Sequence, residues 1–115
     1  FGMNRVGVAA ALAALKDQDY LAEVIDKIKA SRDRISAIAR ANGLEPLPSA
    51  TNFVAIDCGR DGTHARAIVD GLMEHGVFIR MPGVAPLNRC IRISAGPEQD
   101  MALLEEVLPK VLKGL

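Results

Sequence analysis

The sequence has few aromatic residues and no net charge. Its 115 residues include no Trp, one Tyr and three Phe, and 14 Lys and Arg are matched by 14 Asp and Glu. The core must therefore be built from Ala, Val, Ile and Leu. Balanced charge removes the electrostatic argument for binding nucleic acid or an anionic membrane surface, so we expect neither partner. No apolar run approaches the roughly 20 residues that span a bilayer.

Cysteine and histidine are also scarce. Cys58 and Cys90 lie far apart and outside any C-x-x-C pattern, and His64 and His75 do not accompany either of them. A zinc site needs more ligands at closer spacing, so we expect no metal. We expect two free thiols in a reducing cytoplasm, with a disulfide as the alternative.

The first residues show neither an initiating Met nor the pattern of a secretory signal peptide. The chain opens with Phe-Gly-Met-Asn, as a stretch from inside a longer coding sequence would. We therefore expect it to be a piece of a larger protein, with processing or tag removal as the alternative.

The first third of the chain predicts two helices. Residues 5–15 are almost wholly Ala, Val, Leu and Gly, and a helix that is apolar nearly all round is buried on several sides. This favours a partner surface beyond the chain. Residues 20–41 repeat apolar positions at three- and four-residue steps and end at Asn42-Gly43. These positions are Leu21, Val24, Ile25, Ile28, Ile35 and Ile38.

The remainder predicts alternating strands and helices. Pro46, Pro48 and Ser49 indicate a linker, followed by strands over 52–57, 77–80 and 90–94, since Ile91 and Ile93 alternate with polar residues in the last of these. A helix over 64–75 follows Thr63 as N-cap and has Ile68, Val69, Leu72 and Met73 as its buried stripe. Pro97 suits the first turn of a final helix, which Pro109 would kink. The fold class is α/β: two layers, with a small three-stranded sheet and helices packed on one face.

Three residues are candidates for binding chemistry. Arg92 lies in mid-strand on the face opposite Ile91 and Ile93, where a rigidly held guanidinium can bind a carboxylate through two parallel bonds. Arg80 ends the preceding predicted strand, from which it could reach a ligand. Asn52, at a strand entry, could satisfy backbone groups or orient a ligand. Solvated strand positions are the alternative for both arginines.

No catalytic residue emerges from the pattern. Neither histidine has a Ser or Cys partner for nucleophilic catalysis. The sequence contains no G-x-G-x-x-G or P-loop motif.

Three segments in order carry a family resemblance. They are Asn52-Phe53-Val54, then Gly-Val-Phe-Ile-Arg ending at Arg80, and then Cys-Ile-Arg-Ile-Ser-Ala-Gly around Arg92. Together they resemble the C-terminal domain of histidinol-phosphate aminotransferase. That enzyme is a fold-type I, pyridoxal-phosphate-dependent aminotransferase. Residues 9–21 resemble the helix pair that leads from the large domain to the small one. The resemblance covers essentially the whole chain.

The resemblance implies a division of labour. Residues 1–18 correspond to the helix that links to a large domain, and residues 19–115 to the small domain. Arg92 matches the arginine that binds the substrate α-carboxylate, Arg80 matches a pocket arginine that helps to hold a substrate phosphate, and Asn52 matches a recurrent, mainly structural asparagine.

The rest of the machinery belongs to the implied large domain. The cofactor pyridoxal 5'-phosphate is held there in the family, and none of the chain's lysines lies in a matching motif. The resemblance therefore implies transamination by a homodimeric parent in amino-acid, and specifically histidine, biosynthesis. The substrate is an amino acid or amino-alcohol phosphate with a 2-oxo acid, and the isolated chain is expected to be inactive.

Two alternatives remain open at this stage. Within the family, the substrate could be an aromatic amino acid or a phosphorylated threonine that is decarboxylated. Outside it, the chain could be a free-standing βαββα module that binds a small ligand or a regulatory partner, with the two arginines as surface charges.

Overall fold

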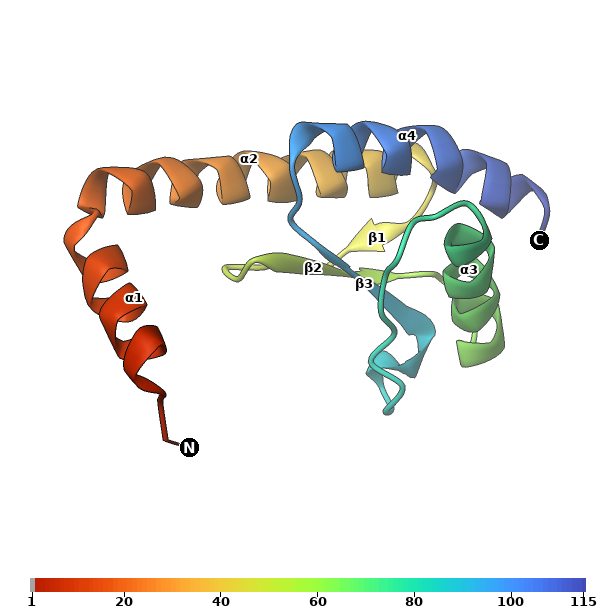
Figure 1. Ribbon diagram of the computed structural model, residues 1–115. Helices are drawn as coiled ribbons and strands as arrows, with labels where there is room; N and C mark the ends of the chain where they lie inside the picture. Colours follow the sequence, from red (N-terminus) through yellow and green to blue (C-terminus); the bar gives the residue numbers. More distant parts are fainter. Residues whose placement is uncertain (1) are drawn as a thin grey trace.

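The computed structural model describes residues 2–115 and has two layers, helices above a small sheet (Figure 1). Its helices and strands are, in order, α1 (Arg5–Lys16), α2 (Gln18–Ala41), β1 (Glu45–Pro46), β2 (Phe53–Asp57), α3 (Gly62–Glu74), the 3-10 turn η1 (Leu87–Arg89), β3 (Cys90–Ser94) and α4 (Glu98–Lys113). Within the described residues, no helix is both long and apolar enough to cross a membrane.

Three of the helices have an N-cap residue whose side-chain oxygen accepts a backbone hydrogen bond. Asn4 accepts a hydrogen bond from the N–H of Gly7, and Asp17 accepts one from Tyr20, so each leaves one fewer unpaired donor in a first turn. For α3 the predicted cap, Thr63, is wrong. The carboxylate of Asp61 accepts from the N–H of His64 at 2.9 Å, and the helix therefore begins two residues earlier than predicted.

The sheet is antiparallel, in the order β1-β2-β3. The prediction that Pro46, Pro48 and Ser49 belong to a linker is wrong for Pro46, because Pro46 pairs with Ile56 next to the pair of Glu45 with Asp57. A proline lacks the N–H that a central strand needs, but an edge strand tolerates it. The third strand of the sheet therefore comes from before residue 50.

The predicted strand over 77–80 is also wrong, except at its last residue. The N–H of Val77 donates to the carbonyl of Leu72 at 2.9 Å, so it completes the end of α3 instead of a strand ladder. Gly76 makes this return possible with a φ of 79°. The segment meets the sheet only at Arg80, which forms an isolated antiparallel bridge with Arg92.

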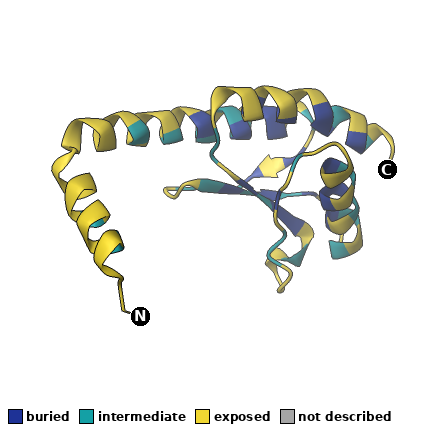
Figure 2. Cartoon of the chain, viewed as in Figure 1, coloured by how far each residue is buried: buried dark blue, intermediate teal, exposed yellow. Residues whose placement is uncertain are grey.

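The helices cover one face of the sheet, as predicted. Val54 and Ile56 of β2 and Ile91 and Ile93 of β3 are buried in one core with side chains of α2, α3 and α4, and Figure 2 shows buried positions on each of these elements. The core contains residues from all three helices, among them Ile35, Ile38, Ile68, Leu72, Leu104 and Leu108. The fold class is therefore α/β, a two-layer domain. The alternate residues of β2 and β3 form the other face of the sheet, here called the open face, where Cys90 is buried and the rest are half-buried or exposed.

Two residues of α2 make polar contacts with the last helix and with the turn that precedes it. Arg34 forms ion pairs with Glu98 and Glu105 of α4. Ser31, buried in α2, accepts a hydrogen bond from the N–H of Gly96 at 3.1 Å, just before α4. These contacts fix the turn that follows β3, and therefore the strand that carries Arg92.

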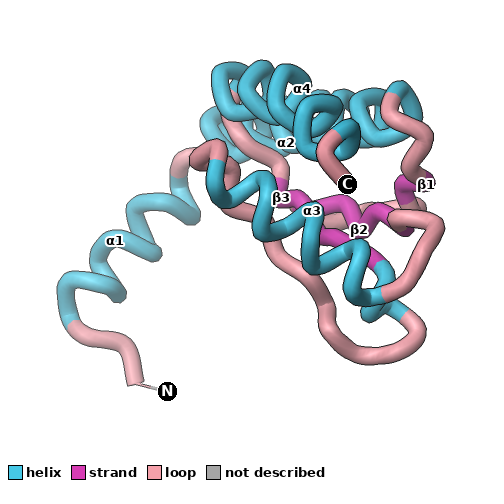
Figure 3. The backbone as a smooth tube through the Cα atoms, turned by 90° about the vertical axis from the view of Figure 1, so that its right-hand side faces the viewer, coloured by secondary structure: helices cyan, strands magenta, loops and turns pink. Residues whose placement is uncertain are grey.

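Helix α1 and the first part of α2 extend away from this core (Figures 1 and 3). Helix α1 has no buried residue, and α2 is buried only from Ser31 onward. The predicted apolar stripe of α2 is thus correct for Ile35 and Ile38, whereas Leu21 and Ile25 are more than 40 % exposed. The described residues therefore leave the apolar helix predicted over 5–15 uncovered, and a partner surface for it stays a prediction.

Candidate substrate-binding face

Arg80 and Arg92 lie side by side on the open face. The N–H of Arg80 donates to the carbonyl of Arg92 at 3.1 Å, and the N–H of Arg92 donates to the carbonyl of Arg80 at 2.6 Å. Directly opposite residues of an antiparallel pair project to the same side of the sheet, with Cα atoms about 5.5 Å apart in this kind of pair. The bridge therefore brings together the two arginines that the sequence singled out.

The guanidinium of Arg92 is held by an aromatic ring. Its central carbon lies 4.9 Å from the ring centre of Phe53, on the ring face, within the range of a cation–π contact. Arg92 is half-buried and Arg80 is exposed. Among residues 2–115, no carboxylate forms an ion pair with either side chain. Two positive charges without ion-pair partners in residues 2–115, one on β3 and one on the segment bridged to it, make this face suited to an anion.

A third arginine near this face is already paired. Nε of Arg89 donates to both carboxylate oxygens of Asp57 at 2.9 Å, and Nη2 donates to Oδ2 at 2.6 Å. The N–H of Gly59 donates to Oδ1 at 2.8 Å. These hydrogen bonds, Arg89's first, lower the pKa of Asp57 and keep it ionised. Sequence reasoning missed this pair because its members are 32 residues apart and only the fold brings them together.

Asn52 lies at the sheet end, outside this group. It is exposed, and its backbone carbonyl accepts from the N–H of Ala95 at 2.8 Å. No hydrogen bond joins its side chain to Arg80 or Arg92 within the described residues. Its position favours the structural role at the strand entry, through the backbone and not the amide as predicted.

The cysteines and histidines are poorly placed for chemistry. Cys58 and Cys90 are free and buried, and burial raises the pKa of Cys58 to about 11. A thiol that stays protonated at neutral pH is a weak nucleophile. His75 contacts the carbonyl of Gly71, and His64 lies beside Arg60. Residues 2–115 contain no group of three possible metal ligands.

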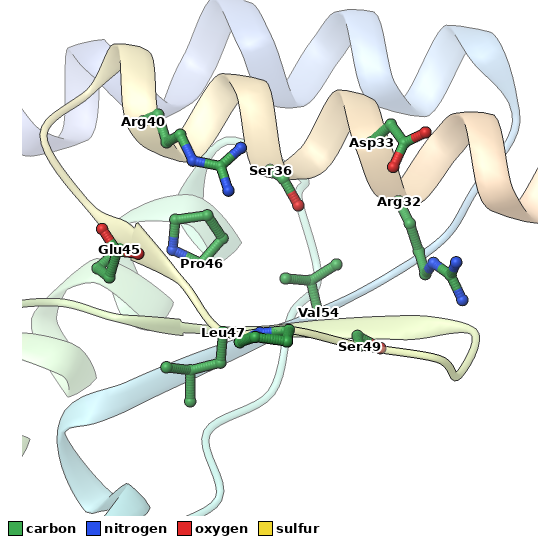
Figure 4. Close-up of a pocket in the computed structure, with 10 residues that line it drawn as sticks. Arg32, Asp33, Ser36, Arg40, Glu45, Pro46, Leu47, Ser49 and Val54 are labelled. Carbon is green, nitrogen blue, oxygen red and sulfur yellow. The ribbon is translucent and has the colours of Figure 1, made fainter.

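A separate groove lies on the helix side of the sheet, between α2 and the segment around β1 (Figure 4). It encloses about 420 Å³. Arg32 and Arg40 line it together with Asp33 and Glu45, so its formal charges cancel. Because Val54 at its floor belongs to the helix-facing side of β2, the groove is distinct from the open face.

In residues 2–115, the helix-covered sheet thus presents two arginines without ion-pair partners on its open face. A family model, aminotransferase class I and II, matches residues 1–111. The chain therefore belongs to the class I and II aminotransferase family.

Known proteins similar to the chain agree with this assignment. Histidinol-phosphate aminotransferase 2 of Methylococcus capsulatus is 36% identical over 112 residues, 97% of this chain and 29% of that protein. The Bacillus velezensis histidinol-phosphate aminotransferase is 33% identical, covering 97% and 30%. The crystal structure of the Sinorhizobium meliloti histidinol-phosphate aminotransferase in complex with pyridoxal-5'-phosphate is 67% identical with a TM-score of 0.96, covering 98% and 31%. The chain spans less than a third of the length of these relatives.

Proposed function

We propose that this chain is the substrate-binding small domain of a pyridoxal-phosphate-dependent, histidinol-phosphate aminotransferase-like enzyme. Residues 19–115 form the small domain, and residues 1–18 lead to a large domain of the same parent. The parent acts in the cytoplasm as a homodimer in histidine biosynthesis. It transfers an amino group between an amino acid or amino-alcohol phosphate and a 2-oxo acid.

The proposal rests on Arg80 and Arg92, the two neighbouring arginines of the open face. Arg92 is anchored by its strand and by Phe53, yet it has no carboxylate partner in residues 2–115. A planar guanidinium with free N–H groups binds a carboxylate through two parallel hydrogen bonds, and partial burial strengthens them. Arg92 therefore binds the substrate carboxylate and fixes its orientation.

Arg80 supplies the second anchor. It projects from the same face but is more exposed and lies at the end of a loop-borne segment. Such a position suits a group at the far end of the substrate, for example a phosphate. Substrates with and without a distal anion are then distinguished by this one side chain.

The chain's own residues do not fit the needs of the cofactor. Pyridoxal phosphate supplies an electron sink for the substrate α-carbon and needs a lysine to hold it covalently. Lys27, Lys29 and Lys110 instead form ion pairs with Glu or Asp of their own helices, and they lie on exposed helix surfaces. No lysine belongs to the elements of the open face. We therefore assign cofactor binding to the large domain, and expect the isolated chain to be inactive.

Replacement of Arg92 by Ala in the full-length enzyme tests the proposal. Loss of a charge-assisted pair is expected to lower kcat/KM for a carboxylate substrate by roughly tenfold to a hundredfold, and to leave cofactor binding unchanged. Arg40→Ala is the matched control, because Arg40 is exposed on α2 at the other side of the sheet. An unchanged KM and kcat in Arg92→Ala contradicts the assignment.

A free-standing ligand-binding module is the alternative function. A stable monomer that buries the apolar first helix in its own core would favour it. Because α1 has no buried residue, the module gains no such support, and we favour the aminotransferase domain, whose family model matches residues 1–111.

A further inference from the structure

Arg92 has two possible partners on the open face. Ala55 lies directly opposite it in β2. The residues two positions to either side of Ala55, Phe53 and Asp57, are its diagonal neighbours, within reach of a long side chain. One neighbour offers an aromatic ring and the other offers a carboxylate.

A free carboxylate would be the stronger partner. Bidentate pairs between Arg and carboxylate exceed an exposed cation–π contact in strength. Nevertheless, the guanidinium lies over Phe53. The arrangement therefore needs something that removes Asp57 as a competitor.

Arg89 removes it. A carboxylate has about four acceptor sites, and Asp57 accepts three hydrogen bonds from Arg89 and one from Gly59. Its capacity is filled and its charge is compensated.

The contact with Phe53 leaves the N–H donors of Arg92 available to a ligand. A ring face attracts the cation but offers no oxygen to its N–H groups, whereas a carboxylate would occupy them. The ring thus positions the guanidinium and keeps its donors available to a ligand.

We propose that Arg89 is a positioning residue for substrate binding: by saturating Asp57, it keeps Arg92 on Phe53 and open to the substrate carboxylate. This inference rests on the proposed function of Arg92. It adds a role for a pair that otherwise only connects the end of β2 to η1.

Rescue by a second substitution tests the inference in the full-length enzyme. Arg89→Gln frees Asp57, so KM for the carboxylate substrate should rise about tenfold while kcat changes little. Asp57→Asn, and Asp57→Asn combined with Arg89→Gln, contain no competing carboxylate and should keep KM within about twofold of the original. A merely structural ion pair is lost in all three variants, and equal KM values in the single Arg89 variant and the double variant would overturn the proposal.

Two further variants keep the test decisive. If Arg89→Gln does not fold, Arg89→Lys replaces it, because lysine retains the charge but makes fewer hydrogen bonds to Asp57. A rise in the KM of Arg89→Lys that disappears when Asp57→Asn is added supports the inference. A rise that persists in that double variant contradicts it. Phe53→Leu should raise KM about two- to fivefold, and Phe53→Tyr should not.

Failure of this inference is distinguishable from failure of the proposed function. If Arg92→Ala leaves KM unchanged, the function assigned to Arg92 is wrong. If Arg92→Ala raises KM and the Arg89 variants do not, only the role of Arg89 is wrong.

Discussion

A Cβ atom on Gly71 would lie 2.7 Å from Cγ1 of Val111, too close for any real contact. Gly71 is in the last turn of α3 and Val111 is in the last turn of α4. The missing side chain therefore permits these two helices to approach each other. Because α3 and α4 together cover the sheet, this approach helps to hold β3 and Arg92 in place.

Gly71→Ala should destabilise the protein. In an exposed helix the same change stabilises by about 1 kcal/mol, but here overpacking should outweigh that gain and cost about 1–3 kcal/mol. Thermal or urea unfolding measures the effect. Combination with Val111→Ala should recover part of the loss caused by Gly71→Ala, and a stabilised single variant would contradict the close approach.

Two adjacent residues of α3 should respond differently to truncation. The sequence predicted both Leu72 and Met73 in the buried stripe, but Leu72 is fully buried and Met73 is 51 % exposed, so the prediction is wrong for Met73. Leu72→Ala should cost about 2–5 kcal/mol of unfolding free energy. Met73→Ala, the matched control, should cost less than about 1 kcal/mol. Similar losses for the two variants would argue against this orientation of α3.

The Asp57–Arg89 pair should make stability depend on acid pH. Because hydrogen bonds from Arg89 and Gly59 lower the pKa of Asp57 in the folded state, its contribution is fully present above the ordinary pKa of 3.8. It is lost as the pH falls through the lowered folded value. Unfolding should therefore show a steeper loss of stability below about pH 4 in the unmodified protein than in Asp57→Asn. Parallel profiles would mean that the pair does not contribute in this way.

The helices and strands β2 and β3 could be predicted from the sequence because most of their apolar residues follow the helix or strand period closely. Strand β1 could not, since Pro46 is typical of a linker and only pairing with Ile56 makes it an edge strand. The Val-Phe-Ile run after Gly76 has strand-like residues, but its first N–H is used by the end of α3. The strand propensity of these residues does not show that the end of α3 and a neighbouring strand compete for this N–H.

The site was predicted in part for the same reason. Arg92 follows from alternation with Ile91 and Ile93, and Arg80 was chosen as a strand end. Their direct pairing, and the saturation of Asp57 by Arg89, depend on contacts distant in sequence. The family resemblance supplied roles that the spacing of these residues did not.

Half-reactions of the full-length enzyme with two amino donors test the central claim most directly. One donor carries an α-carboxylate, and the other is an amino-alcohol phosphate without a carboxylate. Arg92→Ala should impair the carboxylate donor at least tenfold more than the phosphate donor, and Arg80→Ala should show the reverse preference. Equal impairment of both donors by each variant, or none, would contradict the account in which Arg92 binds the carboxylate of one donor and Arg80 binds the phosphate of the other.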